Sequence, residues 1–166
     1  INIANVDGAA VFYKEACSIP SSMAAARCLV AARAVCGKKV RLLQSDCIKA
    51  YVQALLDGPP MFIRMPKAWW PKSWHGKYSD PVCRCWRALY GHPRAGECWH
   101  DHLEEVLVSL GFAAVEGWPS VWARGRTLRE IVVIIAYVDD LLFYGGEQLD
   151  GVIEELNKHI KMEEPK

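Results

Sequence analysis

The stretch IVVIIAYVDDLLFYGG, from Ile131 to Gly146, decides the fold of this chain. Two apolar runs, rich in β-branched and aromatic residues, flank the adjacent carboxylates Asp139 and Asp140. Such runs on both sides of a short polar break predict a β-hairpin over residues 131–145. Because unpaired charges are rarely buried, we expect both carboxylates to project from the exposed tip of this hairpin.

The two carboxylates also suggest a chemical role. Held close together in a rigid hairpin, Asp139 and Asp140 would form a dense negative site that a hard cation would relieve. Mg²⁺ is commonly bound by one or two carboxylates together with substrate phosphates. Aspartate is also a favoured turn residue, so the pair by itself favours an ordinary turn over a metal site.

Length and composition favour a soluble segment of a longer protein. The 166 residues suit one domain, and 52% hydrophobic residues are enough to build a core. Ile1 is not a start methionine, and the residues after it lack the features of a signal peptide. The longest apolar run, residues 131–138, is far shorter than the roughly 20 residues of a membrane helix. We therefore expect no membrane partner.

The seven cysteines are an odd number and contain no C-x-x-C pair, so their spacing indicates neither a zinc site nor a disulfide framework. As reduced thiols they favour an intracellular location.

Charge is unevenly distributed although the net charge is only +1. Residues 1–100 carry 14 basic and 6 acidic residues, whereas residues 101–166 carry 6 and 13. A basic half joined to an acidic half is typical of a polyanion-binding surface beside a metal-binding one. An uneven distribution of charged residues over solvent-exposed faces, with no binding role, explains the pattern equally well.

The order of elements predicts an α+β fold in which helices cover one face of a mostly antiparallel sheet. Helices are expected at 23–35 (capped by Ser21 or Ser22 and stopped by Gly37), 95–110 and 147–160, with a helical turn at 47–56. Strands are expected at 38–46, 61–66 and 120–125 besides the hairpin, with a loop at 68–81 and an extended segment at 82–91. We expect one domain, residues 1–166, with residues 58–88 as a candidate looser subdomain.

Three segments together resemble a known family. Tyr137-Val138-Asp139-Asp140 resembles the active-site hairpin of reverse transcriptases, in the form found in copia-type LTR retrotransposons. Residues 42–66, LLQSDCIKAYVQALLDGPPMFIRMP, are similar to the family segment in which a strand delivers a catalytic Asp. Residues 87–112 resemble its Leu-Tyr-Gly segment and the helix that follows. The resemblance implies a palm-like (ferredoxin-like) antiparallel sheet with partial fingers.

The resemblance also implies an activity and a set of ligands. The implied enzyme is an RNA-directed DNA polymerase that transfers nucleotides from dNTPs to a primer 3′-hydroxyl on an RNA or DNA template. Asp46, Asp139 and Asp140 are the implied catalytic residues. Asp46 and Asp139 would bridge two Mg²⁺ ions, with Mn²⁺ as the alternative, and the backbone carbonyl of Cys47 would complete one shell. Asp140 would bind metal less directly.

Further residues are implied to handle the substrates. The backbone amides of Lys49, Ala50 and Tyr51 would cradle the triphosphate, and the Tyr51 ring would clash with a 2′-hydroxyl. The other interpretation of Tyr51 is a half-buried aromatic residue of the core. Tyr90, Gly91 and Arg94 would position template and base. Many family members carry Gln where Arg94 stands and Arg where Glu97 stands, so this chain departs from the family there.

A tryptophan-rich segment follows the second strand. Aromatic residues interleaved with basic residues can stack bases and track a phosphate backbone. Packing of this loop against the sheet is an equal alternative. The residues concerned are Trp69, Trp70, Trp74 and Trp86 among Lys67, Lys72, Lys77, Arg84 and Arg87.

Three other functions stay open on the sequence. One is a catalytically inactive or domesticated relative that serves as a nucleic-acid-binding module. Another is a Mg²⁺-dependent phosphohydrolase or nucleotide cyclase on a palm-like fold, which would not need Tyr51. The third is a structural protein with an Asp-Asp turn. In the polymerase hypothesis, the remaining fingers, thumb and other enzymes would lie in the rest of a polyprotein, in the cytoplasm, a virus-like particle or the nucleus.

Overall fold

The computed structural model describes residues 21, 23–127 and 130–166. Its α-helices are α1 (Met23–Cys36), α2 (Ala50–Gln53), α3 (Ala95–Ser109) and α4 (Leu149–Asn157). Its strands are β1 (Arg41–Asp46), β2 (Met61–Arg64), β3 (Val82–Cys85), β4 (Ala113–Ala114), β5 (Val121–Arg124), β6 (Val132–Tyr137) and β7 (Asp140–Gly145). Short 3₁₀ turns occur at Gly37–Lys39, Lys67–Trp69 and Lys72–Trp74. The elements confirm the predicted order, with β4 added.

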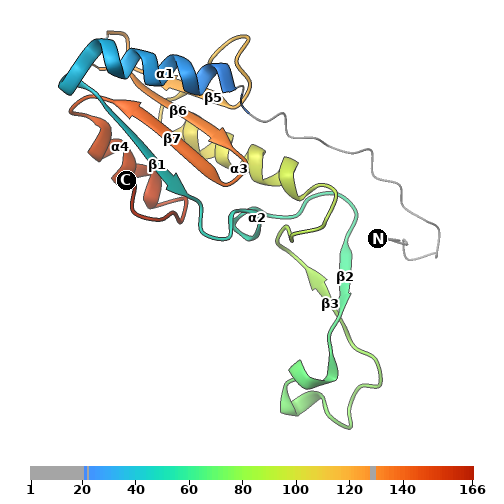
Figure 1. The fold of residues 1–166 in the computed structure, drawn as a ribbon. Helices are drawn as coiled ribbons and strands as arrows, with labels where there is room; N and C mark the ends of the chain where they lie inside the picture. Colours follow the sequence, from blue (N-terminus) through green and yellow to red (C-terminus); the bar gives the residue numbers. More distant parts are fainter. Residues whose placement is uncertain (1–20, 22, 128–129) are drawn as a thin grey trace.

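Five strands form one antiparallel sheet in the order β1-β7-β6-β5-β4. β7 therefore lies between β1 and β6, although β1 is separated from β7 by most of the chain (Figure 1). The register runs from Arg41 opposite Gly145 to Asp46 opposite Asp140. The expected mostly antiparallel sheet is confirmed.

The hairpin has a different tip from the one predicted. Tyr137 pairs with Asp140, so the loop consists of Val138 and Asp139 and not of the two aspartates. Val138 has a φ of 60°, and a positive φ at the first loop residue is what a type II′ turn requires. Asp140 is consequently the first residue of β7, and it lies opposite Asp46.

The sheet is covered on both faces. Alternate residues of β6 and β7, among them Ile134 and Phe143, pack with buried residues of α3 and α4. The residues between them, among them Ile135 and Leu142, pack with Ala25 and Leu29 of α1. The prediction that helices cover one face is therefore wrong. A strand flanked by water on one face would alternate polar and apolar residues, and residues 132–136 do not alternate.

β2 and β3 form a separate two-stranded ribbon that projects away from the main sheet (Figure 1). Its base is held by two backbone hydrogen bonds, from Leu56 N to Trp86 O at 2.9 Å and from Ala88 N to Ala54 O at 3.1 Å. The ribbon falls within residues 58–88, the candidate looser subdomain. Whether that segment behaves as a subdomain stays a prediction.

The described residues cover the cysteines and the ends of α1 only in part. Six cysteines in the described residues are free thiols, as expected, whereas Cys17 lies outside that part of the chain. The cap predicted at Ser22 also lies outside it, and α1 ends before Gly37, whose φ is 64°. No helix among the described residues has the length and apolar character needed to cross a bilayer.

The packing of α3 against the sheet can be tested with two leucines. Leu107 of α3 is fully buried, whereas Leu55 is 65% exposed. Leu107→Ala should lower the free energy of unfolding by about 2–5 kcal/mol, because it removes buried methyl groups and leaves a cavity. Leu55→Ala should change it by less than about 0.5 kcal/mol. Urea unfolding followed by circular dichroism measures both values, and equal effects would contradict the assigned core.

Candidate active site

Three carboxylates gather where β1 meets the β6–β7 hairpin. Asp46 is the last residue of β1 and lies opposite Asp140, the first residue of β7. The backbone N–H of Cys47 donates to the carbonyl oxygen of Asp139 at 2.7 Å. Segments almost a hundred residues apart in sequence thus place Asp46, Asp139 and Asp140 together at one end of the sheet.

The carboxylates influence one another electrostatically. The pKa of Asp46 is raised, first by partial loss of solvent and then by the negative charges of Asp139, Asp140 and Glu163. Burial, and then the charges of Asp46, Asp139 and Asp140, raise the pKa of the neighbouring Cys47 thiol to about 12. In the absence of a bound metal, the Cys47 thiol therefore stays protonated at neutral pH. The shifts show a negative potential that would favour a bound cation.

The residues present fit a metal that is shared with a substrate. In the described part of the chain, no three His, Cys, Asp or Glu side chains form a ready-made metal cage. Mg²⁺ does not require such a cage, since it is usually held by one or two carboxylates, water and substrate phosphates. The donor set of Asp46, Asp139 and Asp140, at a partly exposed strand end, is suited to that mode of binding.

Two residues that hold the carboxylate segment by hydrogen bonds were not predicted from the sequence. The Gln44 side-chain amide donates to Asp140 Oδ1 at 3.1 Å. The Trp99 indole N–H donates to the carbonyl oxygen of Val138 at 2.6 Å and so fixes the hairpin loop. Gln44 lies two residues before Asp46, on the same face of β1, and this spacing is a signal that could have identified it. No local pattern links Trp99 to Val138.

The last residues of the chain line the outer edge of β1. Glu163 N donates to Asp46 O at 2.8 Å, and Gln44 and Lys166 exchange two backbone hydrogen bonds of 2.9 Å. Ser45 Oγ donates to Glu163 O at 2.6 Å. This pairing holds Asp46 from the side opposite β7 and brings the Glu163 charge near it.

The two tyrosines predicted to handle nucleotide and template pack against each other. The rings of Tyr51 and Tyr90 have centroids 4.6 Å apart. Tyr51 is half-buried against the core, whereas Tyr90 is exposed. The pKa of Tyr90 is raised by partial burial and then by the charge of Asp139, which places its hydroxyl within electrostatic reach of the carboxylates. Both interpretations of Tyr51 are compatible with this position.

The segment before Tyr51 is less regular than expected. α2 has four residues, and Lys49 before it has a φ of 52° in the left-handed region. The cradle of backbone amides predicted at Lys49, Ala50 and Tyr51 stays a prediction.

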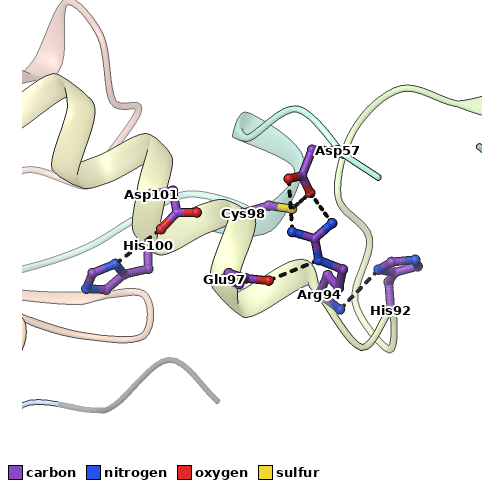
Figure 2. A network of polar contacts seen from close by, with 7 residues as sticks. All are labelled: Asp57, His92, Arg94, Glu97, Cys98, His100 and Asp101. Carbon is purple, nitrogen blue, oxygen red and sulfur yellow. Dashed lines mark hydrogen bonds and ion pairs between the residues drawn. The ribbon is translucent and has the colours of Figure 1, made fainter. Parts of the chain in front are cut away.

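Arg94 is held by carboxylates of this chain (Figure 2). Its Nη1 and Nη2 atoms each lie 2.9 Å from one Asp57 oxygen, and its Nε donates to Glu97 Oε2 at 3.0 Å. Cys98 Sγ donates to Asp57 Oδ1 at 3.1 Å. The two departures from the family, Arg94 and Glu97, are therefore a bonded pair. The predicted role of Arg94 beside the template is untested.

The backbone beside this network favours glycine at position 58. Gly58 has a φ of +81°, and a Cβ atom there would lie 2.6 Å from Arg94 Nη1. The loop that leads into β2 is thereby joined to the start of α3 through Asp57 and Arg94.

Comparison with known proteins gives a family match and relatives from transposons. The family model described as reverse transcriptase (RNA-dependent DNA polymerase) matches residues 5–165. A retrovirus-related Pol polyprotein from transposon RE2 of Arabidopsis thaliana is 30% identical over 87 residues, 51% of this chain and 6% of that protein. A putative transposon Ty5-1 protein of Saccharomyces cerevisiae is 26% identical over 121 residues, 72% of this chain and 37% of that protein. The chain thus spans well under half of either relative.

The Asp57–Arg94 contact should make stability depend on pH. Hydrogen bonding from Cys98 and the charge of Arg94 lower the pKa of Asp57. An acid whose pKa is lower in the folded state stabilises the fold above its unfolded value of about 3.9, and the effect is lost as pH falls through the folded pKa. Asp57→Asn should therefore lower the free energy of unfolding at pH 7 by up to about 1 kcal/mol, since Asp57 is largely exposed.

Urea unfolding at pH 7 and below about pH 4 measures this difference, which should shrink at the lower pH. Asp80→Asn is the matched control, because the Asp80–Arg64 pair is exposed at both residues and should contribute little. A loss of stability at Asp57 that does not depend on pH would contradict the ion pair.

Asp46 should change stability with pH in the direction opposite to Asp57. Its raised pKa means that the charged form destabilises the fold at neutral pH, and that stability is gained as pH falls through the folded pKa. Asp46→Asn should raise Tm at pH 7 without metal by about 1–2 °C at low salt, and by less at high salt. Differential scanning calorimetry measures the shift. The exposed Glu164→Gln serves as control, and a lowered Tm for Asp46→Asn would contradict the repulsion.

Proposed function

The chain belongs to the reverse transcriptase (RNA-dependent DNA polymerase) family, and on this premise we propose that it is the palm, with part of the fingers, of a copia-type retrotransposon enzyme. The proposed reaction transfers a nucleotide from a dNTP to a primer 3′-hydroxyl. One observation carries the proposal: the β1–β7 register places Asp46 opposite Asp140 and next to Asp139. The palm-like sheet would comprise β1, β7, β6 and β5, and the β2–β3 ribbon would belong to the fingers.

Asp46 and Asp139 are the proposed metal ligands. Two bound Mg²⁺ ions, or Mn²⁺ in their place, would supply activation of the primer hydroxyl and stabilisation of the leaving pyrophosphate. Asp140 would bind metal less directly, which agrees with its hydrogen bond from Gln44. The backbone carbonyl of Cys47 is a further proposed ligand. The raised pKa of Asp46 supports this assignment, since a cation would relieve the repulsion that causes it.

The other residues would bind and orient the substrates. Tyr51 would lie beneath the sugar of the incoming nucleotide and exclude a 2′-hydroxyl. Its packing against the core and its ring contact with Tyr90 support a defined position for this side chain. Lys49 and Ala50 would offer backbone amides to the triphosphate. Tyr90, Gly91 and Arg94 would position the template base.

The partners proposed for the whole protein go beyond this segment. They are an RNA or DNA template with its primer, dNTPs and the remainder of a polyprotein. No membrane partner is proposed. The proposed location is intracellular: the cytoplasm, a virus-like particle or the nucleus.

Calorimetry tests the proposed metal site. Mg²⁺ binding to the chain should strengthen when primer–template and nucleotide are added, because substrate phosphates complete the ligand set. Asp139→Asn should weaken that binding at least about tenfold. Asp150→Asn, which changes an exposed carboxylate on α4, should leave it unchanged. If wild type and Asp139→Asn bind Mg²⁺ equally weakly while both hold nucleic acid, the chain is a binding module and the proposal fails.

A further inference from the structure

One face of the β2–β3 ribbon carries exposed aromatic and basic side chains. Side chains of a strand alternate between its faces, and the pairing sets Phe62 opposite Arg84 and Arg64 opposite Val82. These four residues are exposed, and so is Trp86, two residues after Arg84. We call Phe62, Arg64, Val82, Arg84 and Trp86 the outer face of the ribbon. The opposite face, which includes Ile63 and Cys83, is half-buried.

The tryptophans of this region divide into two kinds. Trp70 is half-buried and donates from Nε1 to Met65 O at 2.8 Å, and half-buried Trp74 packs edge-on against Tyr78. Trp69 at the ribbon tip is instead 71% exposed, and Trp86 is 62% exposed. Packing thus accounts for two rings and leaves two large aromatic surfaces in solvent.

Cations accompany the exposed rings. The Arg84 guanidinium lies 3.9 Å from the centroid of the Trp86 ring. Residues 61–87 contain six lysines and arginines and one carboxylate, Asp80, which pairs with Arg64 at 2.9 Å. The positive charge of the first hundred residues is therefore concentrated on a projecting element (Figure 1).

We propose that the outer face and Trp69 form an accessory binding site for unpaired nucleic acid, separate from the carboxylates. Bases would stack on Trp86, Trp69 and Phe62, while the cations contact the phosphates. Base stacking on aromatic side chains and tracking of the backbone by cations is the general mode of single-strand binding. The site requires neither metal nor nucleotide. Its biological setting, a single-stranded template, rests on the proposed function.

Two other polyanions fit this surface less well. A duplex keeps its bases stacked inside, so it could meet the cations of the ribbon but could not use its exposed rings. An anionic membrane is usually bound by a helix with a broad, continuous apolar face. Here the apolar residues alternate with arginines along each strand, which suits separate bases better than a lipid surface.

Fluorescence anisotropy of a short fluorescein-labelled oligothymidylate, added to the full chain in EDTA, tests the proposal. Trp69→Leu and Trp86→Leu should each weaken binding about tenfold, because leucine keeps apolar bulk and loses the stacking surface. Wild type should bind the single strand more tightly than a duplex of the same length, and should bind it in preference to phosphatidylserine vesicles. Equal affinity of wild type and both variants, or tighter binding of the duplex or of the vesicles, would overturn the proposal.

Paired charge variants locate the phosphate contacts. Lys72→Ala with Lys77→Ala, in the ribbon tip, should make the dependence of log affinity on log salt shallower by about 1.4. Lys38→Ala with Lys39→Ala, exposed before the start of β1, should leave that slope unchanged. The same change in both pairs would mean a non-specific attraction to net charge, and the ribbon site would be wrong.

Two further measurements keep the inference independent of variant folding and of catalysis. Photocrosslinking of an iodouracil oligonucleotide to the wild-type chain should label peptides that contain Trp69 or Trp86, and labelling elsewhere alone would overturn the site. Asp139→Asn should bind the oligonucleotide as wild type does in EDTA. Loss of metal binding in that variant with oligonucleotide binding retained would separate the two sites, whereas loss of both would overturn an accessory site.

Discussion

The pairing of β1 with β7 is the constraint on which the candidate site depends. It sets Asp46 directly opposite Asp140, although like charges facing each other across two strands are destabilising. The position persists because it is held from several sides: by the strand register, by the Trp99 contact with Val138, and by the chain end along β1. Unfavourable interactions that the surrounding structure maintains, such as this repulsion between carboxylates, are typical of binding and catalytic sites.

The same strands explain the layers of the fold. Residues 132–136 lack polar alternation, and the structure sends alternate residues to α3 and α4 on one face and to α1 on the other. The continuous apolar run was itself evidence for cover on both faces. The prediction of helices on one face was wrong because it rested on the order of elements alone. A strand without polar alternation is covered on both faces.

The two departures from the family, Arg94 and Glu97, belong to one network of polar contacts. Arg94 donates a hydrogen bond to Glu97, and it also forms an ion pair with Asp57 (Figure 2). Gly58, with a φ of +81°, lies next to the Arg94 guanidinium and leaves room for it in this position. The network joins the loop that leads to the ribbon to the start of α3, so these two departures change how the chain is held together.

The sequence by itself determined the helices and strands other than β4, their order, and the three segments that carry the family resemblance. These features follow from local periodicity and turn chemistry, which involve residues a few positions apart. Only the tertiary structure decided that Gln44 holds Asp140, that Trp99 holds the hairpin loop, and which tryptophans stay exposed. The first two contacts join residues 96 and 39 positions apart. Partners so distant in sequence are chosen by packing, and they meet only once the sheet has formed.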